Sequence, residues 1–330
     1  MAIKTIALAS LALMATTIGI YFMMNDTKTE KTYLRQFIEH GKRYNKQHST
    51  KEEMEYRYAV YTRNMKMIEE HNAKNKSFKM AENKFSDLTF DEFKSKYLSS
   101  QILHNKRKFF NEGELEKGHK DWKKERKVSR VKDQAACGSC WAFSVTGSLE
   151  SAYAIFKKKN IEASEQELVD CSGDYGNYGC NGGLMTSGFE YIKDHKISTE
   201  KDYPYKAFQN SCKAKKFKSK YQVKGYSLLK PTDVTGLVKG LKKQPVSVAI
   251  EVQSDFMHYH SGVYHNEYCG DGLNHGVLAV AYYTDVEDPY FLVKNSWGED
   301  WGDNGYIKMA VGKGSGTCGI ANNWDVIPQV

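Results

Sequence analysis

QAACGSCWAF, at residues 134–143, contains two of the chain's seven cysteines, Cys137 and Cys140, with two residues between them. This C-x-x-C spacing is typical of a dithiol redox pair, of half a zinc site, or of two thiols with separate roles. A thioredoxin-type pair follows a strand, whereas only a short charged run precedes Cys137. The sequence also has no second C-x-x-C to complete a zinc site. We therefore expect two thiols with separate roles, no metal and no cofactor.

The residues from Cys140 onward, CWAFSVTGSLESAYAIFKKK, have the apolar pattern of a helix that begins close to that cysteine. The backbone N–H groups and the dipole at a helix N-terminus stabilise a thiolate, so Cys140 is a candidate nucleophile. His275 lies at the entry to an apolar run, and Asn295 and Trp297 lie in the following run, VKNSWG. Adjacent strand ends would bring the amide to the imidazole and the indole over both, which is the arrangement that an activated thiol requires.

The N-terminal segment determines how the odd number of cysteines is interpreted. Residues 5–24 carry no charge, which is typical of a secretory signal, although their length also suits an uncleaved membrane anchor. In either case the rest of the chain enters the secretory pathway, and contact with a membrane is expected only if the segment is uncleaved. In an oxidising compartment six cysteines can pair and one remains a free thiol.

The pattern of apolar residues changes along the chain. Residues 30–44, 51–74 and 86–98 have helical periodicity, and residues 101–120 are polar and glycine-containing like a linker. After about residue 220 the sequence has short β-like runs, at 245–252, 275–284, 290–297 and 305–311. Ser49 and Thr50 suit a capped start for the helix from residue 51, and Ser164 has the pattern of a helix cap. This order favours an α+β fold with two lobes.

The formal net charge of +8 does not indicate a nucleic-acid partner. Most of the excess lies in the first 115 residues, and the basic runs at 105–108, 123–127 and 213–220 are most simply solvated surface. No nucleic-acid-binding motif accompanies them.

QAACGSCWAF, NHGV and NSWG together resemble the papain-like cysteine proteases, specifically the cathepsin L branch. The resemblance extends to the N-terminal half, which is similar to the inhibitory propeptide of cathepsin L-like zymogens. It implies a papain-like fold with a helical lobe and a β-barrel-like lobe, preceded by a small helical propeptide domain. The propeptide motifs are carried by Glu53, Arg57, Val60, Tyr61, Asn64, Ile68 and Asn72, and then by Asn83, Phe85 and Asp87, with Ala81 in place of the usual Gly.

The resemblance also implies a role for each site residue. Cys140 would attack the peptide carbonyl as a thiolate, and His275 would carry the proton. Asn295 would orient His275, with Trp297 shielding that contact, and Gln134 would donate to the oxyanion. A cysteine endopeptidase is therefore expected, and the rival hypothesis is a catalytically inactive relative that acts by binding.

Disulfide pairing and specificity are implied in the same way. The family's pairing joins Cys137 to Cys180, Cys171 to Cys212 and Cys269 to Cys318, and leaves Cys140 free. The main substrate pocket, which takes the second residue before the cut, would accept a hydrophobic group. Asn323 departs from the small apolar residue usual there, and Ala135 departs from the usual Gly after Gln134. The positions that match this pocket are Leu184, Met185, Ala249, Leu273, Gly276 and Asn323.

The expected organisation is a signal peptide or anchor at 1–24, an inhibitory propeptide at 25–115 and a peptidase domain at 116–330. The propeptide would act as an intramolecular inhibitor, and acid protonation of carboxylates such as Asp87 would release it. We expect self-cleavage between about residues 105 and 120, protein or peptide substrates, and a monomer. The destination is a lysosome, a digestive vacuole or the extracellular space. Sequons at Asn25 and Asn75 can carry glycans.

Overall fold

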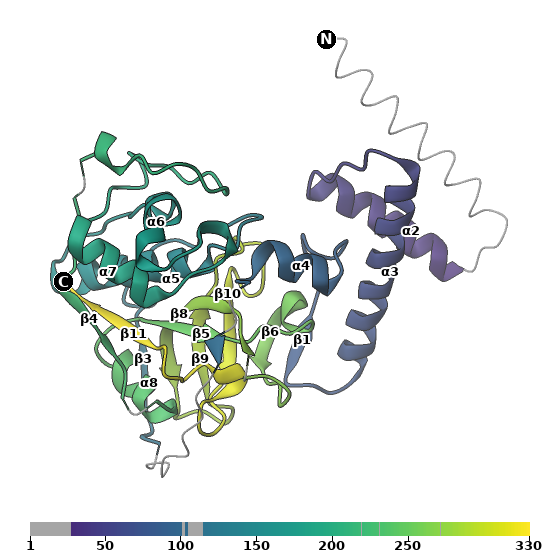
Figure 1. Ribbon diagram of the computed structural model, residues 1–330. Helices are drawn as coiled ribbons and strands as arrows, with labels where there is room; N and C mark the ends of the chain where they lie inside the picture. Colours follow the sequence, from purple (N-terminus) through teal and green to yellow (C-terminus); the bar gives the residue numbers. More distant parts are fainter. Residues whose placement is uncertain (1–27, 101–102, 105–114, 219, 231, 271) are drawn as a thin grey trace. The chain divides into compact units, whose positions relative to one another are not determined.

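A computed structural model describes residues 28–330 of the protein, except 101–102, 105–114, 219, 231 and 271 (Figure 1). The described chain forms two compact units, one of residues 28–74 and 84–89, the other of residues 75–83 and 90–330. The expected signal or anchor at 1–24 lies outside the described residues. Among the helices that are described, none has the length and apolar character needed to cross a bilayer.

The smaller unit is built on two helices, α2 (Lys28–Arg43) and α3 (Lys51–Ala73). The predicted cap of α3 is confirmed, because the Thr50 side chain accepts a hydrogen bond from the Glu53 backbone N–H. Satisfying this otherwise unpaired N–H fixes the start of the helix.

Buried polar contacts hold residues 84–89 against α3. The Asn64 side chain is buried, and its Nδ2 donates to the carbonyl oxygens of Ser86 and Leu88, each at 2.9 Å. The Asp87 carboxylate accepts from Lys46 Nζ at 2.8 Å. One amide thus satisfies two backbone acceptors that burial would otherwise leave unpaired.

The larger unit contains one mixed sheet, in the order β1-β6-β10-β9-β8-β5-β11-β4, with β3 paired to β8. Its path among the described residues has two ends, so the expected barrel-like lobe is an open mixed sheet and not a closed barrel. A separate pair is formed by β2 and β7. The strands are β1 (Phe78–Met80), β2 (Leu103–His104), β3 (His119–Asp121), β4 (Gly225–Leu228), β5 (Val246–Ile250), β6 (Tyr259–Tyr264), β7 (Gly272–Leu273), β8 (His275–Tyr283), β9 (Tyr290–Lys294), β10 (Tyr306–Ala310) and β11 (Val326–Gln329).

The helices of this unit lie mainly on one side of the sheet, where Figure 1 shows α5, α6 and α7 grouped together. Helix α5 packs directly against β8, and the Ser144 hydroxyl donates to the Val277 carbonyl at 2.7 Å. Gly147 allows this close approach, because a Cβ there would meet Leu278 at 3.1 Å. The helices are α4 (Phe90–Tyr97), α5 (Cys140–Phe156), α6 (Glu165–Cys171), α7 (Met185–His195) and α8 (Val234–Leu241), with short 3-10 turns at Gly173–Tyr175, Gly179–Asn181, Ala214–Lys216, Phe256–His258 and Thr317–Gly319.

The strongest sequence expectations about elements are confirmed. A helix begins at Cys140, Ser164 caps α6 by accepting from the Glu167 N–H at 3.0 Å, and the four β-like runs become β5, β8, β9 and β10. The α+β class is confirmed as well. The sequence did not single out β1 or β6, which pair with each other. Strand β1 has only three residues, and the sequence of β6, YHSGVY, contains polar residues and a glycine that weaken a β pattern.

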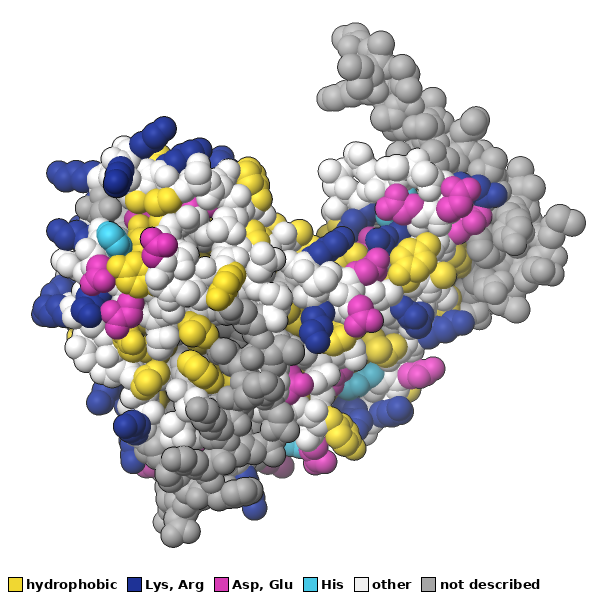
Figure 2. Space-filling view, viewed as in Figure 1, with side chains coloured by type: hydrophobic (Ala, Val, Ile, Leu, Met, Phe, Trp, Pro, Cys, Tyr) yellow, Lys and Arg dark blue, Asp and Glu magenta, His cyan; other side chains and the backbone are white. Residues whose placement is uncertain are grey.

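Figure 2 shows how charged side chains are distributed over one face of the molecule. On the face shown in Figure 2, Lys and Arg side chains lie singly or in small groups among polar and acidic neighbours. Among the described residues on this face, the basic side chains form no single continuous area.

Candidate active site

Cys140 lies at the first residue of α5 and is fully buried. It is the one cysteine without a disulfide in the described chain. Cys137, three residues before it, is bonded to Cys180, and the Gly138 N–H donates to the Cys180 carbonyl at 2.8 Å. A Cβ on Gly138 would lie 2.4 Å from that carbonyl oxygen, so the disulfide and the glycine together fix the loop that leads into α5.

His275 begins β8, and the sheet register brings its partners to it. Antiparallel pairing of β8 with β9 places Leu278 opposite Lys294, so that Asn295 continues from β9 beside the start of β8. His275 Nε2 lies 2.8 Å from Asn295 Oδ1. The Gly276 N–H points at Cys140 Sγ at 3.4 Å. The structure therefore brings together the cysteine, the histidine and the asparagine that the sequence predicted.

Trp297 covers the histidine. Its ring stacks on the imidazole of His275 with centroids 4.7 Å apart and planes inclined by 25°. The indole is fully buried, and edge-on contacts with Phe93 and Phe256 hold it in place. This packing keeps water away from the hydrogen bond between His275 and Asn295, which strengthens that bond.

Every hydrogen-bonding group of the Gln134 side chain has a partner in this structure. Its Oε1 accepts from the Ser296 hydroxyl at 2.7 Å. Its Nε2 donates to two carbonyl oxygens, those of Cys137 and Tyr97, each at 2.8 Å. The amide that was predicted to bind an oxyanion therefore binds the backbone carbonyl of Tyr97, the last residue of α4.

The chain that follows Tyr97 lies on the loops around Cys140. The Ser99 N–H donates to the Asn274 carbonyl at 2.9 Å, and the Ser100 N–H donates to the Asn181 carbonyl at 3.2 Å. Gly182 has no room for a side chain, because a Cβ there would lie 2.1 Å from Ser99 Oγ. Further along, β2 pairs antiparallel with β7. Residues 97–100 thus lie against the loops around Cys140, and Leu103 pairs with Leu273 of the predicted substrate pocket.

Burial changes the protonation of both reactive groups. It raises the pKa of Cys140 to about 11, although the N–H groups of Gly276 and Trp141 oppose the change. Burial also lowers the pKa of His275 to about 4, although the hydrogen bond with Asn295 opposes that change. Desolvation in the covered site thus favours the neutral thiol and the neutral imidazole over their charged forms.

Ala135 has a left-handed backbone conformation, with φ of 49°. Its N–H donates to Asp133 Oδ1 at 2.9 Å, and its carbonyl accepts from the Cys137 N–H at 2.9 Å. A residue with a Cβ is strained in this conformation, whereas glycine is not. The loop next to Gln134 therefore keeps its shape at a cost in free energy.

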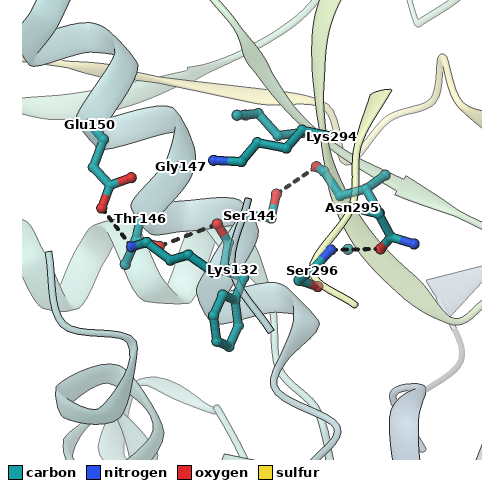
Figure 3. A pocket seen from close by; sticks show the side chains of 12 residues that line it. Lys132, Ser144, Thr146, Gly147, Glu150, Lys294, Asn295 and Ser296 are labelled. Atoms are coloured by element: carbon teal, nitrogen blue, oxygen red, sulfur yellow. Dashed lines mark hydrogen bonds and ion pairs between the residues drawn. The ribbon is translucent and has the colours of Figure 1, made fainter. Parts of the chain in front are cut away.

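Behind the site, a group of buried charges joins α5 and α6 to the sheet (Figure 3). Lys132 Nζ lies 2.7 Å from Glu150 and 2.6 Å from Glu165. Burial alone would lower the pKa of Lys132, but the two carboxylates outweigh it and raise that pKa. Lys294 extends into the same space and donates to the Ser129 hydroxyl at 3.0 Å, and burial lowers its pKa to about 8.

The cavity between these groups has a volume of about 20 Å³ and is bordered by Asn295 and Ser296. That volume is enough for about one water molecule and too small for a substrate side chain. This small cavity borders the active site at Asn295 and is not the substrate groove. Nor does any group of His, Cys, Asp or Glu in the described residues form a metal site.

Most of the residues predicted for the substrate pocket lie near one another. Met185, Ala249 and Leu273 are buried in one hydrophobic cluster, and Gly276 pairs with Ala249 across the sheet. Leu184 immediately precedes α7 and is half-buried.

Asn323, also half-buried, lies in the turn before β11, and the adjacent Asn322 binds the Ala249 carbonyl at 2.7 Å. The remaining disulfides join Cys171 to Cys212 and Cys269 to Cys318. All three bridges join the pairs that the resemblance implies.

Sequence reasoning did not single out Ser296 or the buried Lys132 group. Ser296 lies inside the NSWG motif, between Asn295 and Trp297. Its place between two predicted site residues was the one sequence signal that could have indicated a role in the site. Lys132 lies in the short charged run before Cys137, and nothing in the sequence indicates that this lysine is buried.

Comparisons with known proteins agree with this geometry. Residues 117–327 match the family described as papain family cysteine protease, and residues 37–93 match the cathepsin propeptide inhibitor domain. A cysteine proteinase 3 of Solanum lycopersicum is 43% identical over 320 residues, covering 92% of this chain and 86% of its own length. A cathepsin L-like proteinase of Fasciola hepatica is 40% identical over 292 residues, covering 84% and 88%.

Solved structures give the same result. A digestive procathepsin L 3 of Tenebrio molitor has a TM-score of 0.81 and 34% identity, covering 90% of this chain and 99% of its own. A recombinant stem bromelain precursor also has a TM-score of 0.81, with 32% identity, covering 91% and 99%. The chain therefore belongs to the papain family of cysteine proteases and is a zymogen that carries a cathepsin-type inhibitory propeptide.

Proposed function

We propose that the mature enzyme is an endopeptidase that cleaves through an acyl-enzyme on Cys140. His275 takes the thiol proton and later gives it to the leaving amine, while Asn295 orients His275 and Trp297 shields their contact. Gln134 Nε2 and the Cys140 backbone N–H donate to the oxyanion. The observation that carries this proposal is the unpaired cysteine at the start of α5, beside a strand whose histidine lies 2.8 Å from Asn295.

The propeptide inhibits by filling the oxyanion site with one of its own carbonyl groups. The hydrogen bond from Gln134 Nε2 to the Tyr97 carbonyl supports this step. Tyr97 ends α4, and the chain after it lies against Gly182 and Asn274. Removal of this segment frees one N–H of Gln134 for a substrate oxyanion. The proposed boundaries are a propeptide over residues 25–115 and a peptidase domain over residues 116–330.

The same segment keeps the thiol in its neutral form. Its removal admits water, and hydration together with the N-terminal dipole of α5 then favours the thiolate and the imidazolium. Alkylation of Cys140 by iodoacetamide, followed by mass spectrometry from pH 4 to pH 9, tests this directly. We expect slow alkylation of the intact zymogen below pH 8 and fast alkylation of the mature enzyme. Equal rates in the two forms would show that the segment does not control the thiol.

The mature enzyme prefers a hydrophobic residue at the second position before the cut. The buried cluster that contains Met185, Ala249 and Leu273 supports this preference. Asn323 borders the same region, and its amide would favour polar or shorter side chains more than a small apolar residue would. A peptide-library profile of the native enzyme and of Asn323→Ala tests this. An unchanged preference for Phe and Leu in both enzymes would contradict the role of Asn323.

Activation occurs in acid by self-cleavage between about residues 105 and 120. The ion pair between the buried Asp87 carboxylate and the half-buried Lys46, at 2.8 Å, supports an inhibitor domain whose fold depends on a carboxylate charge. The enzyme works as a monomer in a lysosome, a digestive vacuole or the extracellular space. A Cys140→Ala zymogen that matured normally in acid, with no protease added, would rule out self-cleavage.

Activity itself is tested with a fluorogenic dipeptide that has a hydrophobic residue at the second position. We expect hydrolysis by the acid-treated protein, complete loss after thiol alkylation, and none from Cys140→Ala. The rival function, an inactive relative that acts by binding, would give no hydrolysis from any form. The hydrogen-bonded His275 and Asn295 beside a free thiol favour the enzyme.

A further inference from the structure

We propose that His258 is a pH-sensitive switch in the turn that holds residues 78–83 of the propeptide, and that its protonation in acid loosens this turn. The inference rests on the acid activation proposed above, because it names one group that responds to acid. His258 ends the 3-10 turn Phe256–His258, immediately before β6. It takes no part in the proposed catalytic steps.

Two backbone carbonyl groups of this turn hold the propeptide segment. The Ala81 N–H donates to the His258 carbonyl at 3.0 Å, and Asn83 Nδ2 donates to the Met257 carbonyl at 2.9 Å. Just before these contacts, β1 pairs antiparallel with β6. The conformation of the turn sets the directions of both carbonyl groups. The attachment of residues 78–83 therefore depends on the turn keeping its closed conformation.

The imidazole of His258 is completely buried, with an exposed fraction of 0%. Neither ring nitrogen has a hydrogen-bond partner among the described residues. Burial lowers the pKa of His258 from 6.5 to about 4, and no charged side chain of the described chain contributes to this change. A buried neutral ring without a partner already costs free energy, and a charged ring costs more. Because the positive charge needs water, protonation favours states in which the turn has opened.

The ionisable groups on the neighbouring elements do not compensate for a charge on His258. The Asp255 carboxylate, next to the turn, accepts from the Tyr264 hydroxyl at 2.8 Å and from the Asn266 amide at 3.1 Å. Burial raises the pKa of Tyr264, so this hydroxyl stays neutral in acid. None of the surrounding ionisable groups contributes to the pKa of His258. The others are Lys79 and Glu82 on the docked segment, Tyr259 and His260 on β6, Asp303 before β10 and Lys308 on β10.

Opening of the turn should therefore depend on pH. The pKa of His258 is about 4 in the closed turn, and we take 6.5 for the hydrated imidazole. With these two values, the equilibrium constant for opening rises about 20-fold between pH 7 and pH 5. The folded pKa is the lower one, so the stabilisation is complete above pH 6.5 and is lost as the pH falls toward 4. Opening moves the carbonyl groups that receive Ala81 and Asn83, so acid weakens the attachment of the propeptide segment.

Hydrogen exchange measured by mass spectrometry tests the switch in the full chain, with the Cys140→Ala zymogen as parent. Protection factors are compared, because they correct for the intrinsic effect of pH on exchange. We expect those of residues 78–83 and of β6 to fall about 20-fold from pH 7 to pH 5 in the parent. In His258→Phe, which keeps an aromatic ring but cannot be protonated, they should fall less than about 3-fold. His258→Leu is the second variant, for the case that the larger ring overpacks the site.

His260 provides a matched control. It lies on β6, two residues after His258, and its side chain is exposed. Its protonation therefore needs no opening of the turn, and His260→Gln should lose protection like the parent. In the active zymogen, a gel assay measures the midpoint of self-processing. His258→Phe should shift this midpoint to lower pH, and His260→Gln should leave it unchanged.

Equal losses of protection in the parent and in both His258 variants would overturn the inference. A parent whose residues 78–83 stay equally protected down to pH 4.5 would overturn it as well. Failure of the proposed acid activation gives a different result. An active zymogen that does not process itself in acid, although residues 78–83 lose protection in a way that depends on His258, would refute acid activation and support the switch.

Discussion

Acid should destabilise the helical unit of the propeptide through His40, and replacement of this residue should make the zymogen resist acid. His40 lies on α2, is completely buried, and packs its ring against Tyr44 and Tyr61. Its Nε2 is 3.6 Å from Asp87 Oδ1, but Lys46 already lies 2.8 Å from that oxygen. Protonation of His40 therefore places a second positive charge next to the Asp87 carboxylate, which is already paired with Lys46.

The magnitude follows from the pKa. Burial lowers the pKa of His40 from 6.5 to about 4; the Asp87 carboxylate opposes the change, and Lys46 and Arg43 add to it. The folded pKa is the lower one, so the stabilisation is complete above pH 6.5 and is lost as the pH falls toward 4. At 1.36 kcal/mol for each pKa unit, the helical unit loses about 2 kcal/mol by pH 5 and about 3 kcal/mol by pH 4.

Hydrogen exchange measured by mass spectrometry reports this loss within the full chain. The parent is the Cys140→Ala zymogen, which should not process itself, and the observed amides are those of α3. We expect the free energy of opening of α3 to fall between pH 6.5 and pH 4.5 in the parent, and to fall by about 2 kcal/mol less in a His40→Phe variant. His71→Gln, on α3, is the matched control and should behave like the parent.

Two results would show whether His40 is responsible for the acid sensitivity of the helical unit. If His40→Phe loses as much stability in acid as the parent, the His40 ring does not sense pH and the reasoning is wrong. A smaller residual loss is expected in any case, because burial also lowers the pKa of His48. In the active zymogen, His40→Phe should shift the midpoint of self-processing to lower pH, which a gel assay measures.

Three further outcomes are expected. Ala135→Gly should stabilise the protein by about 0.5–1 kcal/mol, because the strain energy that is relieved at the positive φ exceeds the entropy that the unfolded chain gains. A lower melting temperature of the variant would contradict this. Lys132→Met should lower the free energy of unfolding by about 3–5 kcal/mol, because it leaves Glu150 and Glu165 buried without their cation. Denaturant unfolding measures this loss, and a loss under about 1 kcal/mol would be inconsistent with a buried ion pair. Thr50→Ala should weaken α3 by about 1 kcal/mol, visible as faster hydrogen exchange in its first turn, and unchanged exchange there would argue against the cap.

Several features were determined by the sequence because their signals are local. The start of α5 at Cys140, the caps at Thr50 and Ser164, and the runs that became β5 and β8 each depend on side chains within a few positions. The family follows from short motifs with fixed spacing, because the chemistry of a thiol nucleophile requires those residue types together. The comparisons confirm that family.

The tertiary structure decided what depends on contacts between distant segments. Gln134 could be predicted as a donor, but only the fold brings Tyr97 to one side of its amide and Ser296 to the other. Ala135 looked like a small departure from a motif until its positive φ made it a strained residue. The sequence did not single out Lys132, because only the fold brings Glu150 of α5 and Glu165 of α6 to its side chain. The local sequence determines which chemical groups are present and how they are spaced. Packing between distant segments determines which of these groups are buried, how they are protonated and in which direction an amide points.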